Sequence, residues 1–202
     1  MTRITSVEDL RALYGEARER SVRKQLPALD RHCRRLIELS PFLLLATHGA
    51  DGLGDVTPRG DAPGFVAIED DRTLLLPDRP GNNRLDSFLN ILANPGVGLL
   101  FLVPGMDETL RVNGTAEILA DEGLSARFAV DGKLPRTVVR ITVREAYLHC
   151  AKALMRARLW DPAVQIDRAT LPSMGEMMKE QIGLATAETQ AEMLERYRST
   201  LY

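Results

Sequence analysis

Basic and amide side chains gather around one glycine-containing loop at residues 77–86, where Arg79 and Arg84 flank Asn82 and Asn83. An apolar run at helical spacing follows directly, so this loop feeds the start of a helix. A helix start leaves backbone N–H groups unpaired and carries a partial positive charge. Together with two guanidinium groups, it predicts a site for a phosphate-sized anion. Ordinary capping of the helix by Asn82, with both arginines in water, explains the same residues equally well.

A second polar cluster, Thr57-Pro58-Arg59-Gly60-Asp61, ends an expected strand. Gly60 leaves room for another group to approach the backbone, which suits contact between Arg59 and a planar or phosphorylated ligand. A turn that holds a solvated Arg–Asp pair is the simpler interpretation of this cluster taken alone. Arg-Gly-Asp also occurs in integrin-binding loops, but nothing in the sequence indicates export.

A third cluster lies on the strand expected at residues 109–119, the clearest alternating segment in the chain. Thr109, Arg111 and Asn113 share its polar face, opposite Leu110. Such a face is usually solvated, and it bears on ligand binding only if it lies beside the anion loop.

The fourth cluster follows the last expected strand. Lys152 and Arg156 are four residues apart and share one helix face, with His149 just before them and Trp160 just after. A basic face beside an aromatic ring suits the phosphate or the ring of a ligand. A surface helix with Trp160 packed at a domain edge fits the same pattern.

Composition excludes several function classes. The chain has 202 residues and a formal net charge of −2, so no general attraction to nucleic acid or anionic lipid is expected. The two cysteines, Cys33 and Cys150, indicate a reducing compartment rather than a disulfide framework. Without a secretory signal or a membrane-spanning apolar run, we expect a cytoplasmic protein. Zinc, Walker A, Rossmann and nucleophile-elbow motifs are missing from the sequence, so no metal is expected.

The elements that must position these clusters change from helical to strand periodicity at residue 41. Residues 6–39 are predicted to be helical, with Ser6 as an N-cap, Pro27 opening a second helix and Ser40-Pro41 ending it. The strands are expected at residues 42–47, 55–59, 65–68, 73–77, 97–103, 109–119 and 136–148.

A helix that begins with Asn82, Asn83 and Arg84 in its first turn is expected between two of these strands. Closing helices are predicted at 172–183 and 187–199. This pattern predicts an α+β fold, a predominantly antiparallel barrel of about six strands with helices outside it. The expected organisation is a helical extension at 1–40, a barrel domain at 41–162, and C-terminal helices at 163–202 packed on the barrel.

The four clusters, in this order, resemble the FMN-binding split-barrel family related to pyridoxamine 5'-phosphate oxidase, and most closely a bacterial branch described only as FMN-dependent enzymes. The matching stretches cover most of residues 42–162: FLLLATHGADGLGDVTPRGDAPGF, TLLLPDRPGNNRLDSFLNILANPGVGLLFLVPG, ETLRVNGTAEI and HCAKALMRARLWDP. The resemblance implies a six-stranded split barrel that forms a homodimer, with FMN in two clefts at the interface.

Carried onto this sequence, the resemblance implies that Arg59 contacts the flavin phosphate. Asn83-Arg84 stands where the oxidases have an Arg-Lys pair, so Arg79 is expected to compensate for the missing basic residue. Thr109, five residues before Gly114, takes the place of a glutamine near the flavin. The last cluster would reach the cofactor from the partner subunit or shape the substrate pocket. The expected cofactor-binding set is therefore Arg59, Gly60, Asp61, Asp78, Arg79, Asn82, Asn83, Arg84, Thr109, Arg111, His149, Lys152, Arg156 and Trp160.

The resemblance supports the cofactor better than the substrate. The substrate-binding pattern that the oxidases carry near their C-terminus is missing, and helices from Leu171 onward replace it. The expected function is an FMN-dependent oxidoreductase acting on an unidentified small molecule. A non-catalytic flavin-binding or flavin-sensing protein, or a haem-binding split barrel, is the alternative. No catalytic residue is assigned, although His149 is the best candidate for a general base.

Overall fold

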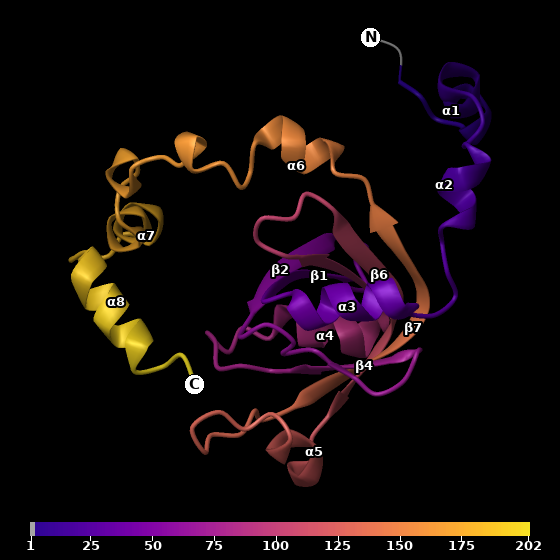
Figure 1. Ribbon diagram of the computed structural model, residues 1–202. Coiled ribbons are helices and arrows are strands. Elements are labelled where there is room, and N and C mark those ends of the chain that lie inside the picture. The colour runs from indigo at the N-terminus through magenta and orange to yellow at the C-terminus, as the bar shows by residue number, and fades with distance from the viewer. Residues whose placement is uncertain (1–2) are drawn as a thin grey trace.

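The computed structural model describes residues 3–202, which include one curved antiparallel sheet (Figure 1). Its strand order within these residues is β2-β1-β5-β6-β7-β4-β3. The strands are β1 (Phe42–His48), β2 (Gly54–Gly60), β3 (Ala67–Ile68), β4 (Thr73–Pro77), β5 (Gly96–Leu102), β6 (Thr109–Leu119) and β7 (Val138–His149). Consecutive neighbours in this order pair antiparallel, as the hairpin-length connections predict.

The sheet is open but strongly curved, which confirms the expected α+β split-barrel class. Its two ends approach each other where the Arg59 guanidinium of β2 lies 3.5 Å from the carboxylate of Asp78, just after β4. The strand expected at residues 65–68 is β3, which has only two residues and lies at the edge of the sheet. Bulges and short edge strands are a common way to end a sheet without exposing a long pairing edge.

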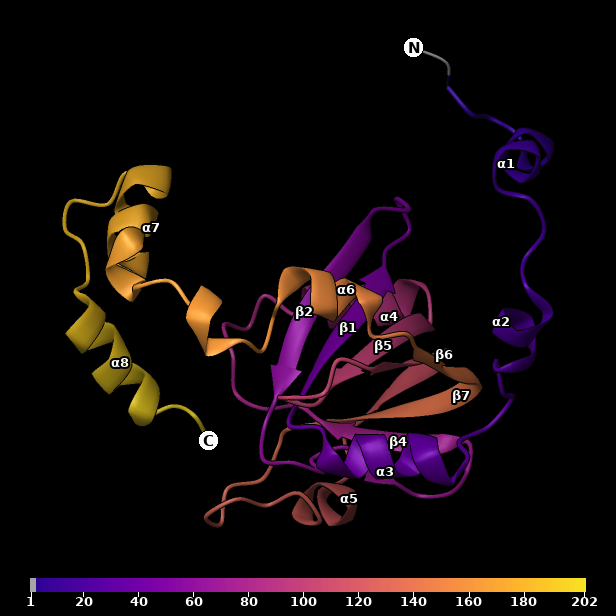
Figure 2. The same ribbon diagram turned by 45° about the horizontal axis from the view of Figure 1, so that its top comes forward.

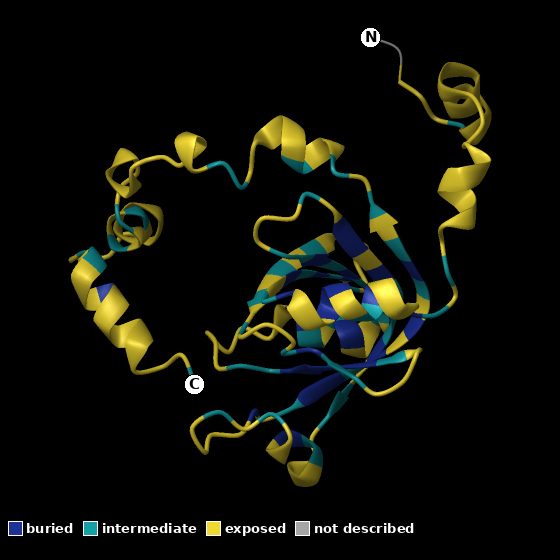
Figure 3. Cartoon of the chain, viewed as in Figure 1, coloured by how far each residue is buried: buried dark blue, intermediate teal, exposed yellow. Residues whose placement is uncertain are grey.

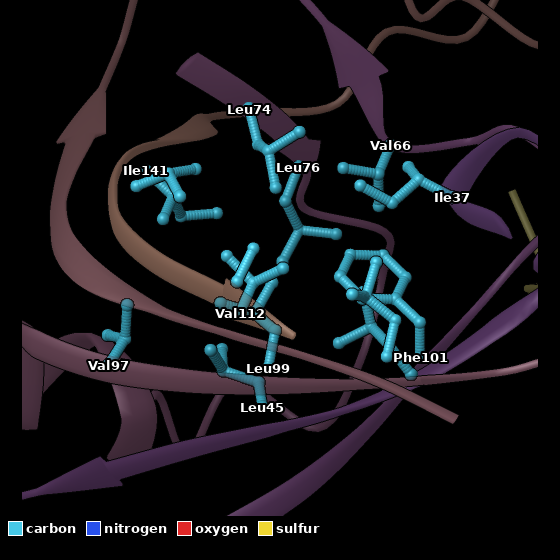
Figure 4. Packing of buried hydrophobic residues seen from close by; sticks show 14 of the residues in the cluster. Ile37, Leu45, Val66, Leu74, Leu76, Val97, Leu99, Phe101, Val112 and Ile141 are labelled. Atoms are coloured by element: carbon cyan, nitrogen blue, oxygen red, sulfur yellow. The ribbon is translucent and has the colours of Figure 1, made fainter. Parts of the chain in front are cut away.

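The concave side of the sheet holds the hydrophobic core (Figure 4). Leu45, Leu99 and Val112 lie side by side on β1, β5 and β6, and Leu74 of β4 stands opposite Ile141 of β7. These side chains alternate with outward-facing neighbours, as the period of two along each strand requires.

A β-bulge at Asn113/Gly114 bends β6 where the sheet curls over. A Cβ atom at Gly114 would lie 2.2 Å from the Thr142 carbonyl oxygen, so only glycine fits there. The bulge lets one long strand serve both halves of the barrel.

The helices in the described part of the chain are α1 (Val7–Tyr14), α2 (Glu19–Arg23), α3 (Arg31–Leu39), α4 (Asp86–Ala93), α5 (Glu122–Ala126), α6 (Lys152–Ala157), α7 (Met174–Ile182) and α8 (Gln190–Arg198), with 3-10 turns at Pro162–Val164 and Arg168–Thr170. Ser6 caps α1 as predicted, by accepting a hydrogen bond from the Asp9 backbone N–H. Both closing helices begin with a capping box, at Ser173 and Thr189.

The prediction that Pro27 opens the second N-terminal helix is wrong. Asp30 is the N-cap of α3, because its carboxylate accepts from the backbone N–H groups of His32 and Cys33 at 3.0 and 2.8 Å. Leu26 is unavailable to a helix, since its N–H and C=O pair with Ala146 of β7, both at 2.9 Å.

α3 belongs to the core rather than to an outer extension. Cys33, Leu36 and Ile37 are buried and join the same cluster as the strands, and Figure 4 shows Ile37 beside Val66. The expected division at residue 40 therefore separates α3 from a core to which it contributes. Residues 1 and 2 of that expected extension lie outside the described residues.

The remaining terminal helices lie away from the sheet. Figures 1 and 2 both place α1–α2 and α7–α8 on opposite sides of the barrel, and Figure 3 shows them almost entirely exposed. The C-terminal segment touches the barrel at Tyr202, whose hydroxyl donates to Asp61 at 2.7 Å and whose backbone oxygen accepts from Lys133 at 2.7 Å. The expected packing of residues 163–202 on the barrel stays a prediction. Among the described residues, no helix is both long and apolar enough to cross a bilayer.

Candidate anion and cofactor site

A polar cavity of about 220 Å³ opens where β2 meets the segment between β4 and α4. An adjoining cavity of about 310 Å³ shares Thr57, Arg59, Arg79, Gly81 and Asn82 with it. The first cavity is lined by Asp55, Val56, Thr57, Arg59, Asp78, Arg79, Gly81, Asn82, Asn83, Arg84, Leu85, Asp86, Ser87 and Phe88. Most of the predicted residues of the first two clusters thus meet around one hollow, although they come from separate parts of the chain.

Arg59 and Asp78 form one wall. Arg59 lies near the end of β2, and its guanidinium faces the Asp78 carboxylate at 3.5 Å with both side chains about three-quarters buried (25% and 22% exposed). Burial raises the pKa of the Asp78 carboxyl, against the opposing fields of Arg59 and Arg136. A separation of 3.5 Å makes a loose ion pair, so Arg59 keeps N–H donors for a ligand.

Arg79 is held by the protein itself. Its guanidinium donates to Asp61 at 2.6 Å and to the Phe128 carbonyl at 2.8 Å, and it lies 5.5 Å from the centre of the Tyr202 ring. Burial opposes ionisation of Asp61, but hydrogen bonds from Tyr202, the Ala62 backbone and Arg79 hold its pKa below the usual value. Arg79 lines the cavity, and two of its N–H groups are occupied by Asp61 and Phe128. That it compensates for the basic residue missing at position 83 stays a prediction.

The loop at Asn82–Leu85 differs from the prediction. Asn82, Asn83 and Arg84 precede the helix instead of forming its first turn, because Leu85 takes a left-handed conformation (φ 60°) immediately before α4. Asn83 is also left-handed (φ 56°), and the Asn82 side chain accepts from the Arg84 backbone N–H at 3.1 Å. Left-handed Leu is costly, and such strain concentrates at functional sites.

Arg84 is the guanidinium of this cavity most easily redirected to a ligand. Its side chain is 73% exposed, and its partner Asp86, at 2.8 Å, is 48% exposed. Exposed ion pairs contribute little to stability, so a ligand anion competes with Asp86 at small cost. The first turn of α4, which begins at Asp86, faces the same cavity and adds the positive end of the helix dipole.

The third cluster lies elsewhere, at the far ends of β6 and β7, where Thr109 pairs with His149. Arg111 donates to the Tyr147 hydroxyl at 2.7 Å, and its guanidinium lies 5.4 Å from that ring. Lys24 lies over the same ring at 5.6 Å and donates to the Leu148 carbonyl at 2.6 Å. A basic and aromatic surface results, but none of its residues lines the cavity described above.

His149 has a buried ring nitrogen, Nε2, without a hydrogen-bond partner among the described residues. Desolvation, followed by the fields of Arg111 and Lys24, lowers the pKa of its imidazole. The ring packs 5.1 Å from that of Tyr147. The lowered pKa favours a neutral imidazole, and the burial of Nε2 keeps this nitrogen from groups outside the chain.

The fourth cluster extends beyond β7. Lys152 and Arg156 lie on α6 and are exposed, and their expected reach toward a partner subunit stays a prediction. Trp160 instead donates its indole N–H to the Met106 carbonyl at 2.8 Å and ties this segment to the β5–β6 connection. The structure therefore brings Arg59, Asp61, Asp78, Arg79 and the Asn82–Arg84 loop together, with Gly60 beside them. It does not bring Thr109, Arg111, His149, Lys152, Arg156 or Trp160 into the same cavity of one chain.

The expected cofactor-binding set left out several residues in or beside the cavities. Thr57 lies two residues before Arg59, so strand periodicity would have placed both on one face. Asp55 lies two residues before Thr57 on β2, so the same periodicity places it on that face as well. Tyr202 gave no signal, because its contact with Asp61 spans 141 residues.

The comparison with family models decides the family. The model described as pyridoxamine 5'-phosphate oxidase matches residues 29–150. The chain belongs to the pyridoxamine 5'-phosphate oxidase family. The match includes α3 and ends at Cys150, in keeping with a core that starts at Leu29. A search of curated protein sequences finds no match.

Solved structures are similar to part of this chain. A histidine-to-alanine variant of HupZ from Group A Streptococcus has a TM-score of 0.50 and 20% sequence identity, covering 59% of this chain and 98% of that one. A structure described by its similarity to pyridoxamine 5'-phosphate oxidase, from Lactobacillus delbrueckii, has a TM-score of 0.48 and 24% identity, covering 61% of this chain and 98% of that one. A structure named F420 reductase has a TM-score of 0.42 and 22% identity, covering 60% and 98%.

Proposed function

We propose that this family member binds FMN and acts as an FMN-dependent oxidoreductase on a small molecule. The observation that carries the proposal is the convergence of Arg59, Arg84 and the Asn82–Asn83 amides on one polar cavity at the start of α4. These groups are hydrogen-bond donors of the kind that binds a phosphate ester.

The donor set fits the phosphate end of FMN. Arg59 is anchored on a strand and loosely paired, while Arg84 is exposed and free to turn inward. In this arrangement Arg59 and Arg84 would hold the phosphate, with the Asn82 and Asn83 amides beside them. Bound FMN supplies two-electron redox chemistry, whereas the protein contributes binding, orientation and exclusion of water.

A homodimer with the cofactor between subunits is part of this proposal. Val56 and Leu85, on the cavity wall, are 60% and 51% exposed, and Leu89 and Leu92 of the adjoining α4 are 60% and 75% exposed. Apolar side chains gathered beside a polar cavity favour coverage by a second protein surface. A partner would also bring its His149, Lys152 and Arg156 clusters to surfaces that one chain leaves open.

Spectroscopy of the purified protein tests the proposal. Protein loaded with FMN should absorb as a flavin, and anaerobic NAD(P)H should bleach it if the protein is a reductase. Bound flavin that no donor reduces would favour a binding or sensing role, and a Soret band in place of flavin absorbance would favour haem. A protein that retains neither chromophore after incubation with each contradicts the proposal.

Light scattering tests the dimer separately. We expect a dimer at micromolar concentration with one FMN for each chain. A monomer that still holds FMN would contradict the placement of the cofactor between subunits.

A further inference from the structure

The Asp78 carboxylate lies in the wall of the anion cavity beside the guanidinium that this cavity needs most. Arg59 is 3.5 Å away and both side chains are about three-quarters buried. The Asp78 backbone is fixed, because its N–H donates to the Thr137 carbonyl at 3.0 Å. An anion bound to Arg59 therefore meets a carboxylate that has little freedom to move aside.

Other charged groups surround Arg59 and Asp78, but they do not remove the repulsion between the Asp78 carboxylate and a bound anion. Arg136, which precedes β7, acts on Asp78 from one side, and Arg79 and Arg84 line the same cavity. Asp55 and Asp86 add two further carboxylates to its wall. The lining thus balances its positive charge with negative charge, which is unusual for a site that binds a dianion.

Two negative oxygens in contact cannot both stay unprotonated without a large penalty. A shared proton removes the penalty, because it turns repulsion into a short, charge-assisted hydrogen bond. A phosphate monoester has a second pKa of about 6, so its dianion readily shares a proton near neutral pH. Sulfate is a far weaker base and accepts such a proton much less readily.

We propose that Asp78 selects phosphate monoesters over sulfate by sharing one proton with the bound phosphate, so that binding takes up a proton. This inference rests on the proposed function, since FMN is the phosphate monoester concerned. The proton leaves a solvent or buffer acid and ends between an Asp78 carboxylate oxygen and a phosphate oxygen, and no bond between heavy atoms changes. Arg59 then turns from the carboxylate toward the anion.

The largely buried setting of Asp78 makes it suited to this role. Burial already raises the pKa of its carboxyl in the free protein, and an adjacent dianion raises it further. Asp86 is a poorer candidate, because it is 48% exposed and paired with exposed Arg84. A purely structural role, in which Asp78 only ties β4 to β2, predicts no proton uptake.

Titration of FMN binding against pH provides the test. For the unmodified protein, FMN affinity should fall by up to about tenfold for each pH unit between roughly pH 6.5 and 8.5, the slope for uptake of one proton. Riboflavin, which lacks the phosphate, should bind with no such slope. Calorimetry in two buffers of different ionisation enthalpy should report uptake of a proton with FMN, independently of any substitution.

Asp78→Asn should flatten the pH dependence of FMN affinity, because the amide cannot take up the proton. Asp131→Asn is the matched control, because it removes one exposed carboxylate outside the cavity. Asp131 has a left-handed backbone conformation, which Asn adopts readily. It should keep the slope of the unmodified protein. FMN binding without proton uptake, or an equal slope in Asp78→Asn, would overturn the inference.

Competition between inorganic phosphate and sulfate separates this inference from the proposed function. Phosphate should displace FMN at least about tenfold more effectively than sulfate at pH 7, and Asp78→Asn should lose this preference. If FMN does not bind at all, the proposed function fails, and thermal stabilisation by phosphate against sulfate still decides the role of Asp78. Equal stabilisation by the two anions would then overturn it.

Discussion

The two polar regions of this molecule differ in how completely one chain assembles them. Around Arg59 and Arg84, the cavity has walls, partners and a fixed backbone within a single chain. At the ends of β6 and β7, Arg111 and His149 lie outside the two cavities described above. Lys152 and Arg156 on α6 are exposed to solvent. The phosphate end of the proposed site is therefore preformed in one chain, and we propose that a partner subunit completes the remainder.

Removing Arg79, which is bound to Asp61 and Phe128, should lower stability more than removing Arg84, which faces the cavity. Arg79→Ala leaves Asp61, whose side chain is 4% exposed, without its guanidinium partner. We expect the free energy of unfolding to fall by about 2–4 kcal/mol, as for a buried pair that loses one member. Urea denaturation measures the free energy of unfolding, which Arg84→Ala should change by less than about 0.5 kcal/mol. Equal losses in the two variants would contradict the division between scaffold and ligand arginines.

Removing Arg84 should instead weaken ligand binding while leaving the free energy of unfolding nearly unchanged. Arg84→Ala should weaken FMN binding by roughly 1.5–3 kcal/mol, the range for a charge-assisted hydrogen bond. Flavin fluorescence titration measures it. Arg35→Ala is the control, because Arg35 also forms an exposed ion pair, with Glu38, but lies on α3 outside the cavity. Unchanged affinity in Arg84→Ala would remove this residue from the site.

Mixed dimers test whether the incomplete region is completed by a partner. Arg156→Ala should weaken FMN binding by about 1 kcal/mol. When Arg84→Ala and Arg156→Ala chains are co-expressed, each mixed dimer should regain one site of normal affinity, because one cavity and one facing α6 stay intact. Binding curves of tagged, purified mixed dimers report this directly. If no normal site is recovered, Arg84 and Arg156 act in the same chain's site. Unchanged affinity in Arg156→Ala alone would remove Arg156 from the site.

The smallest expected effect concerns the pH dependence of stability at His149. Its pKa is lowered in the folded protein, first by desolvation, so the unfolded state binds more protons below the ordinary histidine pKa of about 6.5. Stability should therefore decline as pH falls below that value, and His149→Gln should decline less. Unfolding free energies at pH 7.5 and pH 5.5 provide the comparison. Parallel declines would show that His149 does not titrate differently on folding.

The strands were predictable because their pattern is set by burial. The strand predicted at 73–77 is β4, and the alternation at 109–119 is β6, although its bulge at Gly114 depends on a contact with Thr142 across the sheet. The N-terminal helix starts were less predictable, since Pro27 and Asp30 compete and the pairing of Leu26 with β7 decides between them.

The site was predictable in its residues more than in its geometry. Arg59 and Arg84 meet as expected, but a left-handed Leu85 moves the helix start beyond Arg84, and no periodicity reports such a conformation. Arg79 was expected at the anion, but its hydrogen bonds to Asp61, 18 residues away, and to Phe128, 49 residues away, were not predicted. Local patterns do not encode these long-range choices.

The burial of α3 has a practical consequence for anyone shortening this protein. Trimming to residue 41 would strip Cys33, Leu36 and Ile37 from the mouth of the barrel and leave its apolar lining open to water. Each large side chain withdrawn from such a lining costs roughly 2–5 kcal/mol. A stable minimal version must therefore start ahead of Leu26, whose backbone pairing with Ala146 joins the leading segment to β7.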